Sequence, residues 1–354
     1  RRIMLVGNSH ADSIKDTLKN NSAYRDNFIQ ALVEFEKRSG HPQVNVRDTV
    51  SGPLADELFM GEAFSKTLQN GLHINFVYNS KIAREFLLCS PAVPNHVWEP
   101  QTTKLLLHFS TNAQNVIIAG AYFGDQAIPV ANNIKSTGVC HTFEPNKNNS
   151  DLIIENAGLN NLNNILINNL ALWNKSNEKL IFEGKDALAS TVEAGTSSAN
   201  VLHTITIDDY VAQNKVGKVD LLMIDVEGSE IKVLQGAVEM LKQNKPVVVF
   251  ETHSLYDDWS NGLQNSPSAT LMKELGYEVF AVREFHQNID TADMPIELLP
   301  LDRTYCETPP HHGFNMLAIP AQSLIENDLF RIVYDLSPKL ILPKNDPKFL
   351  PSTF

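Results

Sequence analysis

The chain of 354 residues has little cysteine and no long apolar run. Its three cysteines, Cys89, Cys140 and Cys306, are an odd number without a C-x-x-C pair, which predicts reduced thiols rather than a disulfide or zinc framework. No apolar stretch approaches the length of a membrane span, and the start of the chain shows no signal-peptide pattern. We therefore expect a cytoplasmic protein without a membrane span.

Positive charge is also scarce. The 29 Lys and Arg residues against 41 Asp and Glu give a net charge of −12. Because phosphate contacts need clustered Lys and Arg, this balance argues against a nucleic-acid partner and against binding to anionic membranes. The hydrophobic content of 43% is enough for a packed core. The sequence leaves the oligomeric state open.

The pattern of helices and strands predicts three parts. Residues 1–100 alternate between helical and strand patterns and predict a small α/β domain, with a strand at 44–48, a helix at 55–70 and a proline-bearing linker at 90–100. Residues 101–320 predict the main domain, which includes a mobile loop at 184–199 and a long substrate-side loop between Val282 and Phe314. Residues 321–354 predict one helix, 321–335, and a proline-rich tail.

A glycine turn between two buried strands lies at 115–145. The apolar run 116–119 ends at Gly120, Gly124 follows, and after a helical stretch a second apolar run, 139–143, ends at Glu144. This is the opening half of a nucleotide-binding sheet, in which a carboxylate at the second strand tip accepts ribose hydroxyls. The turn lacks the middle glycine that accommodates a pyrophosphate, which favours S-adenosylmethionine as the cofactor.

A second pair of strands carries acids at its ends. The strand 219–224 is followed by Asp225 and Glu227, and the strand 247–250 by Glu251 and His253. An amphipathic helix beginning at Ser229 separates them. In an open parallel sheet, ligands bind outside the carboxyl ends of the strands, so these side chains should share one rim with Glu144.

These motifs allow a family resemblance to be named. Residues from about 116 to 319 resemble the FkbM family of S-adenosylmethionine-dependent methyltransferases, through GAYFG at 120–124, FEPN at 143–146, TIDDY at 206–210, DLLMIDVEGSEIKVLQGA at 220–237 and VVFETH at 248–253. The resemblance implies a Rossmann-like class I methyltransferase sheet, parallel with a terminal antiparallel hairpin of 277–282 and 314–320. It also implies O-methylation of a hydroxyl on a sugar, a glycan or a natural product.

The resemblance and the strand positions together give the candidate site residues. Cofactor binding is assigned to Gly120, Ala121, Gly124, Glu144, Ala171, Leu172 and Asp225, with the last also a catalytic candidate. For Ala171 and Leu172, core packing is nearly as good an interpretation as contact with adenine. The family's first strand usually ends in Asp-Val-Gly-Ala-Asn, but here Ile118 replaces the Asp and Tyr122 replaces the Asn. Asp125 is the candidate substitute for the lost carboxylate.

Asp225, Glu227 and His253 are the catalytic candidates. Methyl transfer needs a group that holds the acceptor hydroxyl and removes its proton, which a carboxylate or a histidine at the rim can do. Asp225 and Glu227 could also raise one another's pKa, or bind a divalent metal through oxygen ligands. Glu227 is equally well explained as a residue that caps the next helix.

Two other functions stay open at this point. The replacement at Ile118 is compatible with a non-catalytic protein that retained the sheet. Residues 7–10, Gly-Asn-Ser-His, superficially resemble the Gly-Asp-Ser-His block of SGNH hydrolases, with Ser9 as the nucleophile. Without a convincing downstream Asp-x-x-His, a strand-to-helix turn capped by Asn8 or Ser9 is the better interpretation.

Overall fold

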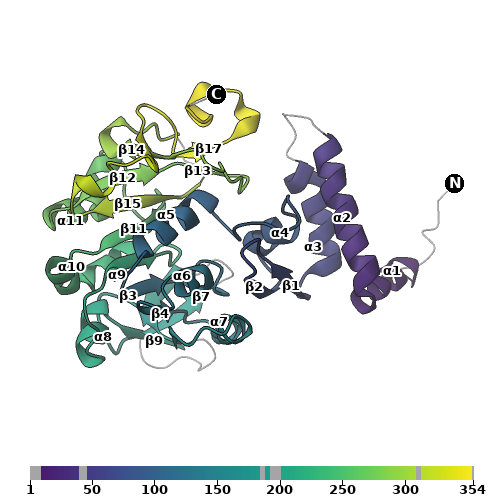
Figure 1. Cartoon of the computed structure of the whole chain (residues 1–354), viewed down its shortest axis with the longest axis horizontal. Helices are drawn as coiled ribbons and strands as arrows, with labels where there is room; N and C mark the ends of the chain where they lie inside the picture. Colours follow the sequence, from purple (N-terminus) through teal and green to yellow (C-terminus); the bar gives the residue numbers. More distant parts are fainter. Residues whose placement is uncertain (1–8, 40–45, 184–187, 192–200, 308–311, 353–354) are drawn as a thin grey trace. The chain divides into compact units, whose positions relative to one another are not determined.

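The structure is a computed structural model, and it describes residues 9–39, 46–183, 188–191, 201–307 and 312–352 (Figure 1). The chain divides into two compact units, Arg1–Val97 and Trp98–Phe354. The predicted C-terminal part, 321–354, lies within the second unit.

The first unit combines helices with one hairpin. Its elements are α1 (Ser9–Asn20), α2 (Ser22–Ser39), a π-helix (Arg47–Ser51), α3 (Gly52–Phe59), β1 (Ala63–Thr67), β2 (His73–Val77) and α4 (Lys81–Leu87). Aromatic rings fill its core, with centroids 5.1 to 6.4 Å apart, namely those of Phe59, Phe64, Phe76, Tyr78 and Phe86. The small α/β character is as predicted.

Two details of this unit were predicted wrongly. The helix expected over 55–70 ends at Phe59, because Phe64 belongs to β1, whose burial alternates along the hairpin. Residues 46–48 of the expected strand are helical, and 44–45 lie outside the described residues. The segment before Ser9, including Gly7 and Asn8, also lies outside them, as do the side chains of Ser9 and His10.

The second unit is built on a nine-stranded sheet in the order β16-β14-β12-β15-β11-β10-β3-β4-β5. Its first five strands along the chain run parallel to one another: β3 (Asn115–Ala119), β4 (Val139–Phe143), β5 (Ile165–Asn168), β10 (Leu221–Ile224) and β11 (Val247–Thr252). The expected antiparallel hairpin of β12 (Glu278–Val282) and β15 (Phe314–Ile319) is confirmed. The strands from β5 to β12 in this order form the predicted class I methyltransferase sheet.

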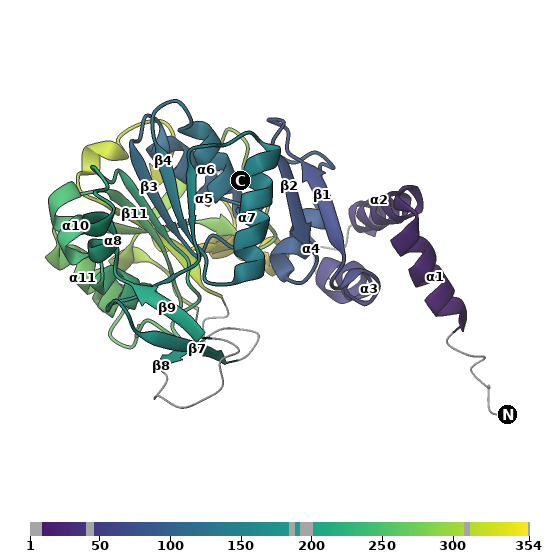
Figure 2. The ribbon, with the colours of Figure 1, turned by 90° about the horizontal axis from the view of Figure 1, so that it is seen from below.

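Helices cover both faces of this sheet (Figure 2). On one face lie α5 (Pro100–Ser110), α6 (Ala127–Asn133) and α7 (Lys147–Leu159). On the other lie α8 (Ile207–Gln213), α10 (Val238–Asn244) and α11 (Pro267–Glu274). The helix α9 (Glu230–Gln235) packs against α11 and β11. The buried side chains of this second group pack on alternate residues of the strands, such as Leu222 and Ile224. Because the residues between them are buried as well, both faces of the central strands are apolar.

Three segments differ from their predictions. The long loop after Val282 contains β13 (Glu284–Phe285) and β14 (Ile296–Pro300), and β14 extends the sheet beside β12. In the expected helix 321–335, only a 3-10 turn forms (Gln322–Leu324), and β16 (Phe330–Ile332) joins the sheet edge. In the expected loop 184–199, β8 (Leu188–Thr191) pairs with β7 (Lys179–Glu183), and the flanking residues 184–187 and 192–199 lie outside the described ones.

The tail is fixed by a buried arginine. Arg283 forms an ion pair with Glu297 and donates hydrogen bonds to the carbonyl oxygens of Ser337, Lys348 and Leu350 at 2.8 to 3.0 Å. Together with β17 (Lys339–Leu340), which pairs with β13, these bonds hold the C-terminal segment against the second unit.

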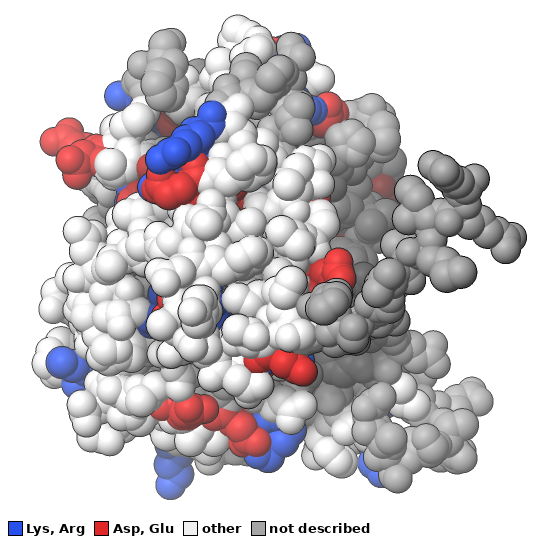
Figure 3. All heavy atoms as spheres, turned by 90° about the vertical axis from the view of Figure 1, so that its right-hand side faces the viewer, with Lys and Arg blue, Asp and Glu red and all other residues white. Residues whose placement is uncertain are grey.

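No helix within the described ranges is long and apolar enough to cross a membrane. On the face shown in Figure 3, the blue Lys and Arg side chains are scattered among acidic and uncharged ones and form no continuous basic area among the coloured residues.

Candidate active site

The parallel strands bring the predicted residues to one rim. In-register pairing places the ends of β3, β4, β10 and β11 side by side, and Gly120, Glu144 and Asp225 directly follow three of these strands. Glu251 is the penultimate residue of β11, at the same edge. The structure therefore brings the rim residues together at one edge of the sheet, as predicted.

The glycine loop is packed more tightly against the protein than the sequence suggested. Gly120 has a φ of 78°, and a methyl group there would lie 1.6 Å from the carbonyl oxygen of Asp225. Gly124 has a φ of 91°, and its methyl group would lie 2.9 Å from Ile128. Glycine is needed at both positions because φ is positive and other backbone or side-chain atoms occupy the space that a Cβ would need.

Glu144 is held by the loop that follows Gly120. Its carboxylate accepts hydrogen bonds from the backbone N–H groups of Tyr122 and Asn146, both at 2.9 Å. It is only 6% exposed, and burial raises its pKa to about 7 despite these hydrogen bonds. Asp125 is also buried, and burial, with the charges of Glu99 and Glu144, raises its pKa to about 7. This is the predicted substitute for the acid missing at position 118.

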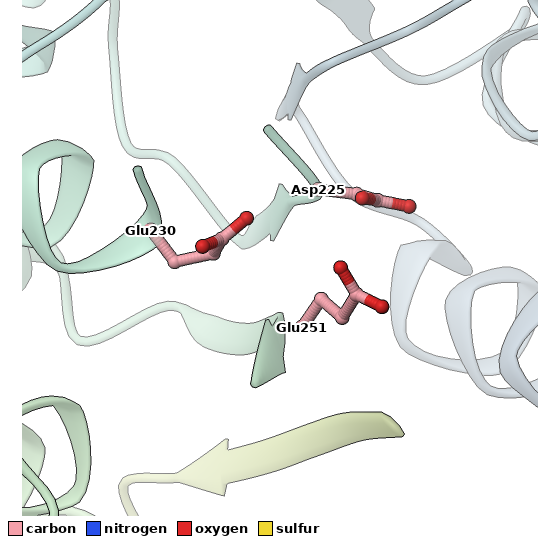
Figure 4. Close-up of side chains that lie close together, drawn as sticks. All are labelled: Asp225, Glu230 and Glu251. Carbon is pink, nitrogen blue, oxygen red and sulfur yellow. The ribbon is translucent and has the colours of Figure 1, made fainter. Parts of the chain in front are cut away.

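Three carboxylates meet at the ends of β10 and β11 (Figure 4). One oxygen from each of Asp225, Glu230 and Glu251 lies within 4.8 Å of the others. We call these three residues the acid cluster. Burial raises the pKa of Glu251 to about 8, and burial with the charges of Glu251 and Glu227 raises the pKa of Asp225 well above its usual value. These carboxyl groups therefore bind protons more tightly than ordinary acids do.

Two further buried acids, Glu99 and Glu284, lie at the start of α5. Glu99 precedes this helix, is buried, and accepts a hydrogen bond of 2.6 Å from Nδ2 of Asn315. Glu284 is also buried, accepts the backbone N–H groups of Gln101 and Thr102 at 3.0 Å, and has a pKa raised to about 8 by burial. The charge of Glu99 contributes to the raised pKa values of both Asp225 and Glu251.

Glu227 and His253 flank the cluster. Glu227 is exposed, with a φ of 54°, and its charge raises the pKa values of Asp225 and Glu251. Glu230, the first residue of α9, holds the preceding loop, because its Oε1 accepts the N–H groups of Val226 and Gly228 at 3.0 and 3.2 Å. His253 is half-buried, with its pKa lowered by burial, and its Nδ1 accepts the N–H of Leu255 at 3.0 Å.

The remaining cofactor candidates are buried. Ala121 is 2% exposed and donates its N–H to the carbonyl oxygen of Phe143 at 3.3 Å. Ala171 and Leu172 form β6, which pairs with β9 (Val201–Ile205) outside the main sheet. Leu172 belongs to the hydrophobic core, so packing accounts for it.

A hollow lined by aromatic rings lies at the start of β15. Its lining includes Trp259, Tyr305, Phe314, Phe349 and Lys339. Lys339 lowers the pKa of Glu251 through its charge, and the ring of Trp259 lies 5.3 Å from that of Phe314. Trp259 is fixed by a hydrogen bond of 3.1 Å to Oγ1 of Thr252, the last residue of β11.

Sequence reasoning missed Glu99, Glu230 and Asn315. Glu230 follows a strand tip at short range, so its position in the DVEGSE segment was an available signal. Glu99 and Asn315 come from a helix start and from an antiparallel strand far along the chain, and no local pattern connects them to the rim.

A family model describes the same region. Residues 119–279 match the model for the methyltransferase FkbM domain, which spans the sheet from the end of β3 to the start of β12. The chain contains an FkbM methyltransferase domain. The matched residues of this methyltransferase domain include Gly120, Glu144 and the acid cluster.

Several solved structures are similar to the chain. A methyltransferase FkbM from Methylobacillus flagellatus KT is 15% identical with a TM-score of 0.36, and the similarity covers 67% of this chain and 52% of that one. An O-methyltransferase from Bacillus cereus in complex with SAH is 15% identical with a TM-score of 0.33, covering 62% of this chain and 80% of that one. The O-methyltransferase TomG from Streptomyces achromogenes, in complex with SAM, is 11% identical with a TM-score of 0.34, covering 65% and 84%. No curated protein matches the chain.

Proposed function

We propose that this methyltransferase domain binds S-adenosylmethionine and transfers its methyl group to a hydroxyl of a sugar, a glycan or a natural product. The acid cluster at the carboxyl ends of β10 and β11 is the observation that carries the proposal. The two O-methyltransferases compared above are named as bound to SAH and SAM, which agrees with this cofactor.

The negative charge of the rim suits a cationic cofactor. Five buried or half-buried acids with raised pKa values lie at or near the rim: Glu99, Asp125, Glu144, Asp225 and Glu251. A positive ligand relieves their mutual repulsion, because opposite charge favours the ionised carboxylate. S-adenosylmethionine supplies a methyl group bonded to a positively charged sulfur. Glu144 would accept the ribose hydroxyls with the lone pairs that the two backbone N–H groups leave unused.

The proposed general base is a carboxylate of the pair Asp225 and Glu251. The acceptor oxygen bonds to the methyl carbon as the carbon–sulfur bond breaks, and the hydroxyl proton passes to a carboxylate of this pair. A pKa of about 8 at Glu251 makes it a stronger base than an ordinary glutamate. His253 suits this role less well, because an Nδ1 that accepts the N–H of Leu255 leaves the proton of the neutral ring on Nε2.

The aromatic hollow is the proposed acceptor site. Aromatic rings offer apolar faces against which the C–H side of a sugar ring or a polyketide can lie, while Lys339 and the acid cluster offer hydrogen-bond partners to hydroxyls. Phe314 is buried, so it gives this hollow an apolar wall.

The test is a methyl-transfer assay with S-adenosylmethionine and a panel of sugars, glycans and polyketide alcohols, with products detected by mass. Asp225→Asn and Glu251→Gln should lower kcat by about 10²–10⁴-fold while cofactor affinity is retained. A matched control is Glu239→Gln, an exposed acid on α10 that pairs with Lys242. Full activity in both cluster variants would refute the assigned base, and methylation confined to nitrogen or carbon acceptors would refute the O-methyl assignment.

A further inference from the structure

We propose that the acid cluster and the side-chain oxygen of Asn315 form a binding site for one hard divalent cation, Mg²⁺ or Mn²⁺. This deepens the proposed function, because the site lies at the same strand ends, but it is tested with metal alone. The proposal stands on the placement of four oxygen-bearing side chains that come from four separate elements.

The ligand atoms suit a hard cation. Asp225, Glu230 and Glu251 each offer a carboxylate oxygen, and the three oxygens lie within 4.8 Å of one another. Figure 4 shows the three side chains, from the end of β10, the start of α9 and the end of β11, with the carboxylates of Asp225 and Glu251 near each other and that of Glu230 to one side. Carboxylate and amide oxygens are the ligands that Mg²⁺ and Mn²⁺ prefer, whereas Zn²⁺ prefers nitrogen and sulfur.

Asn315 supplies the independent observation. It is 1% exposed, and its Oδ1 is a buried oxygen with no hydrogen-bond partner. A buried polar atom left unpaired costs about 1–3 kcal/mol, so such an atom in a native site calls for a ligand. Its Nδ2 is oriented by hydrogen bonds to Glu99 at 2.6 Å and to Oγ1 of Thr102 at 3.1 Å, which fixes which end of the amide carries the free oxygen.

The strand register directs this amide to the cluster. Asn315 on β15 lies directly opposite Glu251 on the antiparallel strand β11, so that both side chains leave the same face of the sheet. Gly313, two residues earlier on that face, is also close to the cluster, since a methyl group there would lie 2.4 Å from Oε1 of Glu251. The register therefore places the Asn315 side chain beside that of Glu251 on one face of the sheet.

The charge around the site points the same way. Glu99 and Glu227 add negative charge to that of the cluster, and each repels the carboxylates of Asp225 and Glu251. Lys339 is a single positive charge that acts on Glu251. A divalent cation would offset more of this repulsion than one lysine does, and it would also give the acceptor hydroxyl an electrophilic partner.

The experiment is a titration of the full chain, first stripped with a chelator, with Mn²⁺ and no cofactor or acceptor. Electron paramagnetic resonance measures the loss of the free Mn²⁺ signal, and Mg²⁺ is then added as a competitor. We expect one bound Mn²⁺ per chain, displaced by Mg²⁺. Asn315→Leu, which keeps the side-chain size but removes the oxygen, and Glu251→Gln should weaken binding by about tenfold or more.

Two further variants keep the test decisive. Glu230→Gln removes one charge and leaves the Asn315 amide in place, so it also should weaken Mn²⁺ binding if Asn315→Leu fails to fold. Glu239→Gln removes one exposed charge on α10 and should leave binding unchanged. Absence of bound Mn²⁺ at millimolar concentration, or equal binding by Glu230→Gln and Glu239→Gln, would overturn the site. Separate titration with S-adenosylmethionine distinguishes this failure from failure of the proposed function.

Discussion

Substitution of Gly120 by alanine should destabilise the methyltransferase unit far more than the same substitution at Gly276. The two glycines have nearly the same φ, 78° and 79°, so the backbone strain on a Cβ is matched. At Gly276 the added methyl group would meet only the flexible Nζ of Lys245 at 3.4 Å. At Gly120 it would lie 1.6 Å from the Asp225 carbonyl oxygen, so the end of β10 must move.

The magnitude follows from these two contributions. A left-handed backbone costs a non-glycine residue about 1–2 kcal/mol, and overpacking of a rigid core costs about 1–3 kcal/mol. Gly276→Ala should therefore lower the free energy of unfolding by about 1–2 kcal/mol, and Gly120→Ala by about 2–5 kcal/mol.

Urea unfolding followed by tryptophan fluorescence is a suitable assay. All three tryptophans, Trp98, Trp173 and Trp259, lie in the second unit, so the signal reports on this unit alone. Equal losses of stability in the two variants would refute the reasoning, because they would show that β3 and β10 do not approach as closely as the structure has them.

Two other predictions concern buried acids. Glu284→Ala removes the acceptor of the N–H groups of Gln101 and Thr102 at the start of α5. It should lower the free energy of unfolding by about 1–3 kcal/mol. An unchanged free energy of unfolding would show that these hydrogen bonds do not stabilise the start of the helix. The free energy of unfolding should also fall as the pH rises from about 5 to about 8, because the folded unit holds protons on Glu251 and Glu284, with pKa values of about 8, after the unfolded chain has released them. Urea midpoints across this range test the slope, which Glu284→Gln should reduce; stability that rises with pH would be contrary to the raised pKa values.

The central sheet was predictable because its strands are short apolar runs that end in turns. The runs 116–119, 139–143, 221–224 and 247–250 are buried on both sides, and such strands need no alternating pattern to be recognised. The rim residues Gly120, Glu144 and Asp225 followed from their places directly after these strands.

The errors arose where tertiary packing overrides local pattern. The helix expected from Ser229 onward is interrupted at Gly236, where a methyl group would lie 2.1 Å from the carbonyl oxygen of Trp173. The segment expected as a C-terminal helix supplies β16, because the sheet edge at β14 offers backbone partners that no local pattern shows. The approach of Asn315 to the acid cluster likewise depends on strand register across the sheet.

The most direct test of the account is calorimetric titration of the purified chain with S-adenosylmethionine and S-adenosylhomocysteine, beside Glu144→Ala. We predict micromolar binding of both ligands by the chain and loss of that binding in the variant, because Glu144 holds the Gly120 loop and is the proposed acceptor of the ribose hydroxyls. Thermal unfolding of the variant controls for folding. Absence of binding by the unmodified chain would contradict the proposed cofactor, and equal binding by a folded Glu144→Ala variant would contradict the assigned rim.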